Sequence, residues 1–246
     1  MGSINNSLIF GGVDSADYGL LVAGDGTFNA PERDVDTVEI PGRNGDLLID
    51  KGRFKNITVE YTVYSYAENM ATFRQQLSDF RSALTSQIGY QRLTDTFHPD
   101  EYRLATFING FEAEPLNYNT LAEITLQFDC KPQRFLTAGE VQQTIPSGSY
   151  TVLMNPTPFD ALPLIEVEGT GTLEIADKTI TIAGSSTQTL VIDSEMMEAY
   201  TIAGDAILPA NNLIGFNDFP KLSPGENGIG FTGLTSVKIT PRWWTL

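Results

Sequence analysis

One short segment of the chain places an imidazole beside carboxylates. His98 and Pro99 are followed by Asp100 and Glu101, and His98 is the only histidine of the 246 residues. Such an imidazole could act as a general base, and a pair of carboxylates could cleave a glycosidic bond. A polar turn at the end of a β-hairpin explains the same residues without any chemistry. Because no second catalytic partner can be placed, we expect the turn.

Cys130, the single cysteine, is a second candidate for a catalytic side chain, because a thiolate can act as a nucleophile. It ends the alternating segment 124–130, in which Ile124, Leu126 and Phe128 share its face. A reactive thiolate needs a nearby base or a helix N-terminus, and neither is evident here. We therefore expect Cys130 to lie in the core as a small hydrophobic side chain. With one cysteine and one histidine, the sequence offers no Cys/His zinc site of the usual kind.

Two further motifs match binding patterns only in part. Gly228, Gly230 and Gly233 have the spacing of a dinucleotide-binding fingerprint, which needs a preceding strand and a following helix. Here polar turn residues precede the glycines and the strand-like segment 237–240 follows them, so we expect a β-hairpin loop. Residues 34–36 begin like a calcium loop, but Val38 takes the third ligand position and no EF-hand is expected.

Aromatic side chains in the second half of the chain offer a possible sugar-binding surface. Trp243 and Trp244 could stack on a sugar if exposed, or close a core if buried. The alternation of Val237 and Ile239 before them favours burial. The aromatic candidates for a sugar site are Tyr200, Phe216, Phe219 and Trp243.

Composition narrows the class of protein. Asp and Glu outnumber Lys and Arg by 31 to 15, giving a net charge of -16. This charge disfavours binding to nucleic acid and to anionic membranes. A hydrophobic content of 41% with 19% charged residues is typical of a globular protein. No secretory signal or membrane span is evident, so we expect synthesis in the cytoplasm.

Hydrophobic periodicity predicts a β-rich first half with one helix. Segments 57–64 and 124–130 alternate with the period of a strand. A helix over about 66–86 is predicted, with Ser65 and Glu68 as its capping box and Gly89 as its terminator. Segments 90–93 and 102–107 are expected to pair, as are 38–40 and 47–49 around a tight turn at Asn44 and Gly45. The apolar face of the helix comprises Met70, Phe73, Leu77, Phe80 and Leu84.

The second half shows only strand signals. Short strand candidates at 164–167, 171–175, 179–182 and 190–192 are separated by turns, as in an all-β sandwich. A polar, turn-rich segment near 136–150 predicts a boundary between the halves. We therefore expect a mainly β protein with two β-sandwich-like domains, at residues 1–136 and 137–246. No catalytic, cofactor-binding or metal site is expected.

Several ordered blocks of sequence resemble the distal tail protein family of long, non-contractile-tailed bacteriophages. Together they cover roughly residues 8–136, and their order is more specific than any one block. The second half matches more loosely, through its β-rich pattern and residues 239–244. The blocks are residues 10–20, 28–34, 40–47, 89–103 and 128–136.

This resemblance implies a structural virion protein without enzymatic activity. Family members form a hexameric hub at the tail tip, in single or stacked rings, between the tail tube and the baseplate, tail-associated lysin and receptor-binding proteins. The first domain builds the ring and carries an extended hairpin, and the second is a galectin-like or jelly-roll sandwich. A carbohydrate-binding module that aids host attachment is the alternative. Arg33 and Arg43 could pair with acids of a neighbouring subunit, and an acidic lumen would repel passing DNA.

Overall fold

The computed structural model describes residues 6–23, 28–116, 121–184, 188–203, 206–216 and 218–246. Contacts divide the chain into unit 1, residues 1–134 with Leu246, and unit 2, residues 135–245. Strands dominate both units, and α1 (Met70–Thr85) is the one α-helix among the described residues. The predicted mainly β class with a single helix is confirmed. No helix in the described ranges is long and apolar enough to span a membrane.

Unit 1 is built on a curled sheet with the strand order β2-β1-β7-β8-β10-β6-β3, to which β9 is added beside β10. Its longest ladder joins β6 to β10, from Tyr66 opposite Leu121 to Ile57 opposite Cys130. The alternation predicted for both strands is therefore confirmed. The strands are β1 (Leu8–Phe10), β2 (Val13–Asp14), β3 (Leu20–Ala23), β6 (Ile57–Tyr66), β7 (Gln91–Asp95), β8 (Glu101–Thr106), β9 (Ala113–Leu116) and β10 (Leu121–Leu136).

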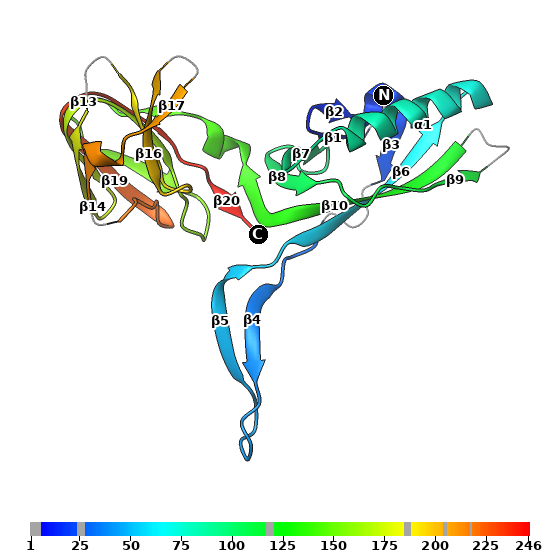
Figure 1. Cartoon of the computed structure of the whole chain (residues 1–246), viewed down its shortest axis with the longest axis horizontal. Coiled ribbons are helices and arrows are strands. Elements are labelled where there is room, and N and C mark those ends of the chain that lie inside the picture. The colour runs from blue at the N-terminus through cyan, green and yellow to red at the C-terminus, as the bar shows by residue number, and fades with distance from the viewer. Residues whose placement is uncertain (1–5, 24–27, 117–120, 185–187, 204–205, 217) are drawn as a thin grey trace. The chain divides into compact units, whose positions relative to one another are not determined.

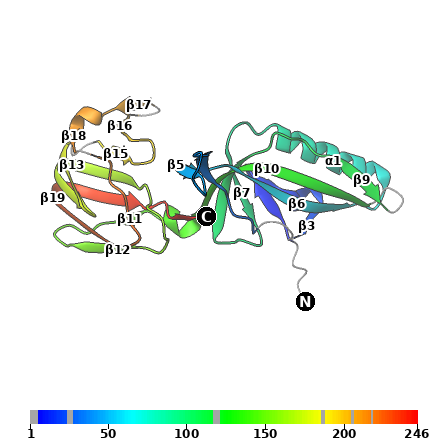
Figure 2. The same cartoon turned by 90° about the horizontal axis from the view of Figure 1, so that it is seen from below.

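Helix α1 lies along one face of this sheet (Figures 1 and 2). Phe73, Leu77, Phe80 and Leu84 are buried in a core that also holds Tyr61 and other sheet residues. Their 3-4-3 spacing places them on one side of the helix, which explains why this face is the one that is covered. Four of the five residues predicted for the apolar face are therefore buried, and Met70 is 40% exposed.

The predicted helix boundaries need correction. Residues up to Tyr66 belong to β6, and Ser65 is buried in that strand opposite Ala122. The helix is instead capped by Asn69, whose Oδ1 accepts a hydrogen bond from the backbone N–H of Thr72 at 3.0 Å. Asparagine and serine are about equally good N-caps, so Ser65 fails as the cap because it belongs to β6. At the other end Ser86 is the C-cap, and Gly89 lies beyond it in the connection to β7.

Both predicted hairpins of unit 1 are present. Strands β7 and β8 pair, with Leu93 opposite Arg103, and residues 96–100 form the turn between them. The second hairpin joins β4 (Arg33–Val38) to β5 (Leu47–Phe54) through residues 39–46. The tight turn predicted at Asn44 and Gly45 is wrong, because the backbone N–H of Arg43 instead donates to the carbonyl of Ile40.

Unit 2 is built on one continuous hydrogen-bonded sheet that folds into two layers. Its strand order is β11-β19-β13-β15-β16-β17, with β12 added to β19, β14 added to β13, and β18 added to β14. The strands are β11 (Gln143–Thr144), β12 (Thr151–Asn155), β13 (Leu164–Ile175), β14 (Lys178–Ala183), β15 (Leu190–Asp193), β16 (Glu198–Ala203), β17 (Ala206–Pro209), β18 (Ile214–Gly215) and β19 (Gly225–Thr240), followed by β20 (Trp244–Thr245).

Glycines allow the two longest strands to turn the corner between the layers. The β13–β19 ladder shifts register between Glu168 and Thr172, and Gly169 and Gly233 have φ values of 98° and 80°. Before the corner β13 pairs with β15, and after it β13 pairs with β14. Strands that change layers at such bulges produce a sandwich. The sandwich is confirmed, but the strands predicted at 164–167 and 171–175 are one strand.

Candidate functional site: the β4–β5 hairpin and its surroundings

The β4–β5 hairpin forms a two-stranded sheet of its own, separate from both large sheets (Figure 1). Val38 lies opposite Leu47, and Asp36 lies opposite Ile49. Because side chains alternate along a strand, Val38, Leu47 and Ile49 project from the same face. These side chains are 45–48% exposed. An isolated two-stranded ribbon is only marginally stable in water. This apolar hairpin face (Val38, Leu47 and Ile49) is therefore available to a partner.

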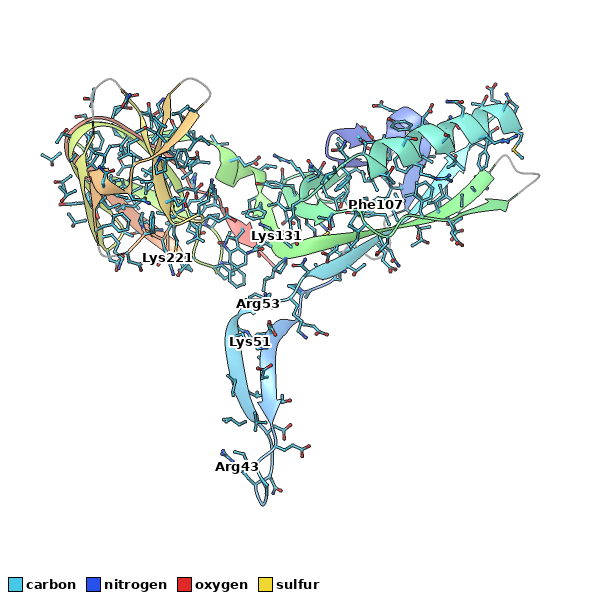
Figure 3. All side chains as sticks on the ribbon, viewed as in Figure 1. Arg43, Lys51, Arg53, Phe107, Lys131 and Lys221 are labelled. Atoms are coloured by element: carbon cyan, nitrogen blue, oxygen red, sulfur yellow. The ribbon has the colours of Figure 1, made fainter. Side chains whose placement is uncertain are left out.

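Ion pairs brace the base of the hairpin. Lys51 Nζ lies 2.7 Å from Asp36 Oδ1 and 3.7 Å from Asp34 Oδ1, and Arg53 Nε donates to Asp34 Oδ2 at 2.7 Å. The hydrogen bond from Arg53 outweighs burial and lowers the pKa of Asp34. Figure 3 shows Lys51 and Arg53 close together on the ribbon, and Arg43 in the segment that joins the strands. The carboxylates of Asp34 and Asp36 on β4 are therefore paired with cations on β5, and these pairs hold the two strands together at the base of the hairpin.

The two arginines that the sequence proposed for subunit pairing behave differently. Arg33 pairs with Asp50 of the same chain, and its guanidinium lies 5.1 Å from the centre of the Phe54 ring. It is therefore already engaged, and the proposal that it binds a neighbour is withdrawn. Arg43 forms no ion pair with any residue that the structure describes. It remains the candidate for a contact with another subunit.

The structure gives His98 a different partner from the one that the sequence suggested. Its Nδ1 lies 3.0 Å from Asp95 Oδ1, while Glu101 Oε2 accepts from Arg134 Nη1 at 3.3 Å. Asp95 Oδ2 also accepts from the hydroxyl of Tyr61 at 2.7 Å. Residues 96–100 form the hairpin turn, as predicted. Tyr61 was missed because it lies on β6, far in the sequence from Asp95, whereas Asp95 is only three residues before His98 and was within reach of the sequence analysis.

The cysteine and the calcium-like motif have structural roles. Cys130 is fully buried in the core of unit 1, as predicted, and burial raises the pKa of its thiol to about 12. The carboxylates of Asp34 and Asp36 are occupied by Lys51 and Arg53. No group of His, Cys, Asp and Glu side chains within the described residues could hold a metal ion.

The glycine motif lies within strand β19, so the loop predicted there is wrong. Gly228 and Gly230 stand two residues apart on one face of that strand, where the ring of Tyr150 crosses them. An ideal Cβ on Gly228 would lie 1.6 Å from the Tyr150 hydroxyl, and one on Gly230 would lie 3.4 Å from Cδ2 of the ring. The glycines thus make room for Tyr150, which is 69% exposed. The sequence analysis had not singled out Tyr150.

The aromatic candidates for sugar binding do not form an exposed row. Trp243 is buried, and Trp244 stacks on Phe159 with 4.4 Å between the ring centroids and donates Nε1–H to the carbonyl of Asp160. Phe216 and Phe219 pack edge to face at 4.6 Å against the core of unit 2. Tyr200 is partly buried in β16. Burial of Trp243 was predicted and is confirmed.

Comparison with known proteins places this geometry in context. Residues 14–130 match the family model described as a phage tail protein RIFT-related domain. The matched range lies within unit 1. The β4–β5 hairpin lies inside the matched range. No curated protein sequence matches the chain.

Solved phage structures share the fold of the whole chain. The crystal structure of Dit (gp 19.1) from phage SPP1, described as a hub adsorption apparatus of phages that infect Gram-positive bacteria, superposes with a TM-score of 0.73 at 15% identity, covering 98% of this chain and 99% of that one. Chains of the activated phage P2 baseplate with Ca and with Sr give TM-scores of 0.53 and 0.52, at 9% and 10% identity. Each of the two matches covers 95% of this chain and 96% of the baseplate chain. The resemblance to distal tail proteins is confirmed.

Proposed function

We propose that the chain is a structural protein of the phage tail tip and that six copies form a ring-shaped hub. The match of residues 14–130 to the phage tail protein family model and the similarity of fold to Dit of phage SPP1 support this proposal. In it, the hub connects the tail tube protein to tail-associated lysin, peripheral baseplate and receptor-binding proteins. The protein is made in the host cytoplasm and resides at the virion tail tip. It has no enzymatic role and uses no cofactor or metal.

The apolar hairpin face is the observation that carries the proposal. Val38, Leu47 and Ile49 are about half exposed, and burying the remainder would contribute about 1 kcal/mol for each side chain. The ion pairs of Lys51 and Arg53 stiffen the base of the same ribbon. These pairs reduce, but do not remove, the entropy that a marginally stable ribbon loses when a partner covers it. A neighbouring copy that covers it would make a head-to-tail contact, and such contacts generate a ring when the rotation between copies closes.

Removing the apolar hairpin face tests the proposal. We expect the wild-type chain to assemble into rings of six, seen by electron microscopy and by light scattering. The triple variant Val38→Ser, Leu47→Ser, Ile49→Ser should remain monomeric because the neighbour gains no apolar contact. Its thermal unfolding midpoint should stay within about 2 °C of the wild type, since exposed positions contribute little to folding.

A matched control separates loss of the interface from loss of surface hydrophobicity. Val141, Val152 and Met154 are exposed apolar side chains of unit 2. Replacing all three with serine should leave the rings intact. Hairpin variants that assemble as well as the wild type would remove the hairpin from the interface.

Arg43 gives a second test of the same interface. Because the structure offers it no intramolecular ion pair among the described residues, a carboxylate of the neighbouring copy is its expected partner. The variant Arg43→Glu should weaken assembly, and the weakening should be greatest at low salt, where charge repulsion is least screened. Intact rings of Arg43→Glu at low salt would contradict this role.

A carbohydrate-binding function is the second candidate, and Tyr150 is the observation that favours it. Its exposed ring is held over Gly228 and Gly230, and a groove of about 260 Å3 beside it is lined by Thr172, Glu174 and other residues. An aromatic face with nearby hydroxyl and carboxylate groups suits a pyranose ring. On a glycan array, wild-type protein should bind a set of glycans that Tyr150→Ala no longer binds. Tyr66→Ala, at an exposed tyrosine of unit 1, is the control, and an empty array would remove this function.

A further inference from the structure

An asparagine followed directly by a glycine occurs three times in the sequence. At such a pair the backbone nitrogen of the glycine is not shielded by a Cβ atom, so it can reach the side-chain carbonyl carbon of the asparagine. The carboxamide is then open to chemical conversion, which makes these asparagines the labile ones. The pairs are Asn44 with Gly45, Asn109 with Gly110, and Asn227 with Gly228.

Asn227 is held firmly inside unit 2. It is only 2% exposed, and it lies in β19 opposite Leu153. Its Nδ2 donates to the carbonyls of Ser223 at 2.8 Å and of Gly225 at 3.0 Å, and its Oδ1 accepts from the backbone N–H of Ser223 at 2.9 Å. A side chain held in this way cannot turn toward the backbone nitrogen of Gly228 unless the strand opens.

Asn44 has none of these restraints. It lies in the hairpin tip, residues 39–46 between β4 and β5, where every residue is exposed. Its side chain forms no hydrogen bond with any residue that the structure describes. An ideal Cβ on Gly45 would meet no atom within 4 Å, so the space around the backbone nitrogen of Gly45 is open. The tip can therefore change its local conformation without breaking the β4–β5 ladder, which ends at Val38 and Leu47.

We propose that Asn44 is a deamidation site, at which the carboxamide in the hairpin tip is converted into a carboxylate. The backbone nitrogen of Gly45 attacks Cγ of Asn44, and the Cγ–Nδ2 bond breaks. Nδ2 leaves as ammonia, which carries away the proton that the Gly45 nitrogen loses, and a cyclic succinimide remains. Water then opens this ring at Cγ to give aspartate, or at the backbone carbonyl carbon of residue 44 to give isoaspartate. Water is the only co-reactant.

The new carboxylate lies next to Arg43 in the chain. Arg43 has no ion pair among the described residues, and Figure 3 shows it in the segment that joins the two strands. Its expected partner is a carboxylate of a neighbouring copy, so the consequence for assembly rests on the proposed function. A negative charge one residue away competes for Arg43 and repels that carboxylate. Chains that age before they assemble therefore lose a contact that fresh chains make.

Peptide mapping by mass spectrometry tests the chemistry on the full-length protein. Native protein is incubated in a mildly alkaline buffer and sampled over time, and a zero-time sample corrects for deamidation during digestion. Because Asn227 reacts only when β19 opens, Asn44 should lose its amide at least about tenfold faster than Asn227. In denaturant the two asparagines should react at similar rates. Retention of the Asn44 amide in the native protein, or equal loss at Asn44 and Asn227, would overturn the proposal.

Charge variants test the consequence for assembly. Asn44→Asp carries the charge of the product from the start and should weaken ring assembly at low salt. Asn109→Asp adds the same charge in the exposed connection between β8 and β9, and it should assemble as well as the wild type. After the incubation the wild type should assemble less well, whereas Asn44→Gln should be unchanged because its longer side chain cyclises slowly.

The two parts of the inference fail separately. Asn44→Asp that assembles at low salt as well as the wild type would overturn the effect on the hub. If the wild type forms no rings, the proposed function fails, and the loss of the Asn44 amide still decides whether this position is a deamidation site.

Discussion

Gly171 of β13 and Thr232 of β19 approach so closely that an ideal Cβ on Gly171 would lie 2.1 Å from the carbonyl oxygen of Thr232. This contact lies where the β13–β19 ladder shifts register and both strands pass from one layer of unit 2 to the other. No side chain larger than hydrogen fits there without moving the backbone. The corner, and with it the sandwich, depends on this glycine.

Replacing Gly171 with alanine should therefore destabilise unit 2. We expect a loss of about 2–4 kcal/mol in the free energy of unfolding, because the clash is with backbone and not with a flexible side chain. Trp243 and Trp244 are the only tryptophans and both belong to unit 2, so tryptophan fluorescence in urea reports its unfolding. Gly215→Ala, where the nearest atom lies at 3.7 Å, is the matched control. Equal unfolding midpoints for the two variants would show that the corner tolerates a Cβ.

The ion pair between Asp193 and Arg242 should make unit 2 sensitive to acid. Arg242 donates from Nη1 and Nη2 to the two carboxylate oxygens at 2.8 and 3.0 Å, and Asp193 is almost fully buried. Burial alone would raise the pKa of Asp193, but the bonds from Arg242 and from two backbone N–H groups outweigh it and lower the pKa. A lowered pKa in the folded state adds stability at neutral pH that is lost as the pH falls through it.

Asp193→Asn should accordingly cost about 3 kcal/mol at pH 7, and the cost should shrink as the pH falls from the usual aspartate pKa of about 4 through the lowered pKa of the folded state. Urea unfolding followed by tryptophan fluorescence at both pH values measures the difference. Asp177→Asn removes an exposed partner of Lys178, 3.5 Å away, and should change little at either pH. A cost for Asp193→Asn that stays constant with pH would contradict the role of the ionised carboxylate.

Cys130 should be unreactive in the folded protein. Its burial and its pKa of about 12 leave almost no accessible thiolate at pH 8. We expect a disulfide reagent to label it roughly a hundredfold or more slowly than a thiol placed at exposed Ser78 of α1 by Ser78→Cys. In denaturant both thiols should react at similar rates. Rapid labelling of native Cys130 would mean that the unit 1 core opens readily.

Sequence periodicity was sufficient for the parts of the fold that depend on local alternation. The buried faces of β6 and β10, the apolar stripe of α1 and the burial of Cys130 and Trp243 all follow from which residue types recur at which spacing. Burial of apolar area is the main driving force at these positions, and it is visible in the sequence.

Features that depend on contacts between distant segments could not be predicted in this way. The need for a glycine at position 171 comes from the backbone of Thr232 on another strand. The need for glycines at positions 228 and 230 comes from the ring of Tyr150, which crosses them. The burial of Arg103 depends on the order of the strands around β8. The cap at Asn69 was missed for a different reason, since the capping box predicted at Ser65 lies in β6, which continues to Tyr66.

The most direct test of the central claim is the mass of the assembled protein. Light scattering over a series of protein concentrations, with native mass spectrometry on the same samples, counts the chains of 26.9 kDa in each particle. The proposed hub predicts particles of six chains, or of twelve if rings stack, and the loss of both when the apolar hairpin face is replaced with serine. A monomer at every concentration, with no change in the hairpin variant, would contradict a self-assembling ring.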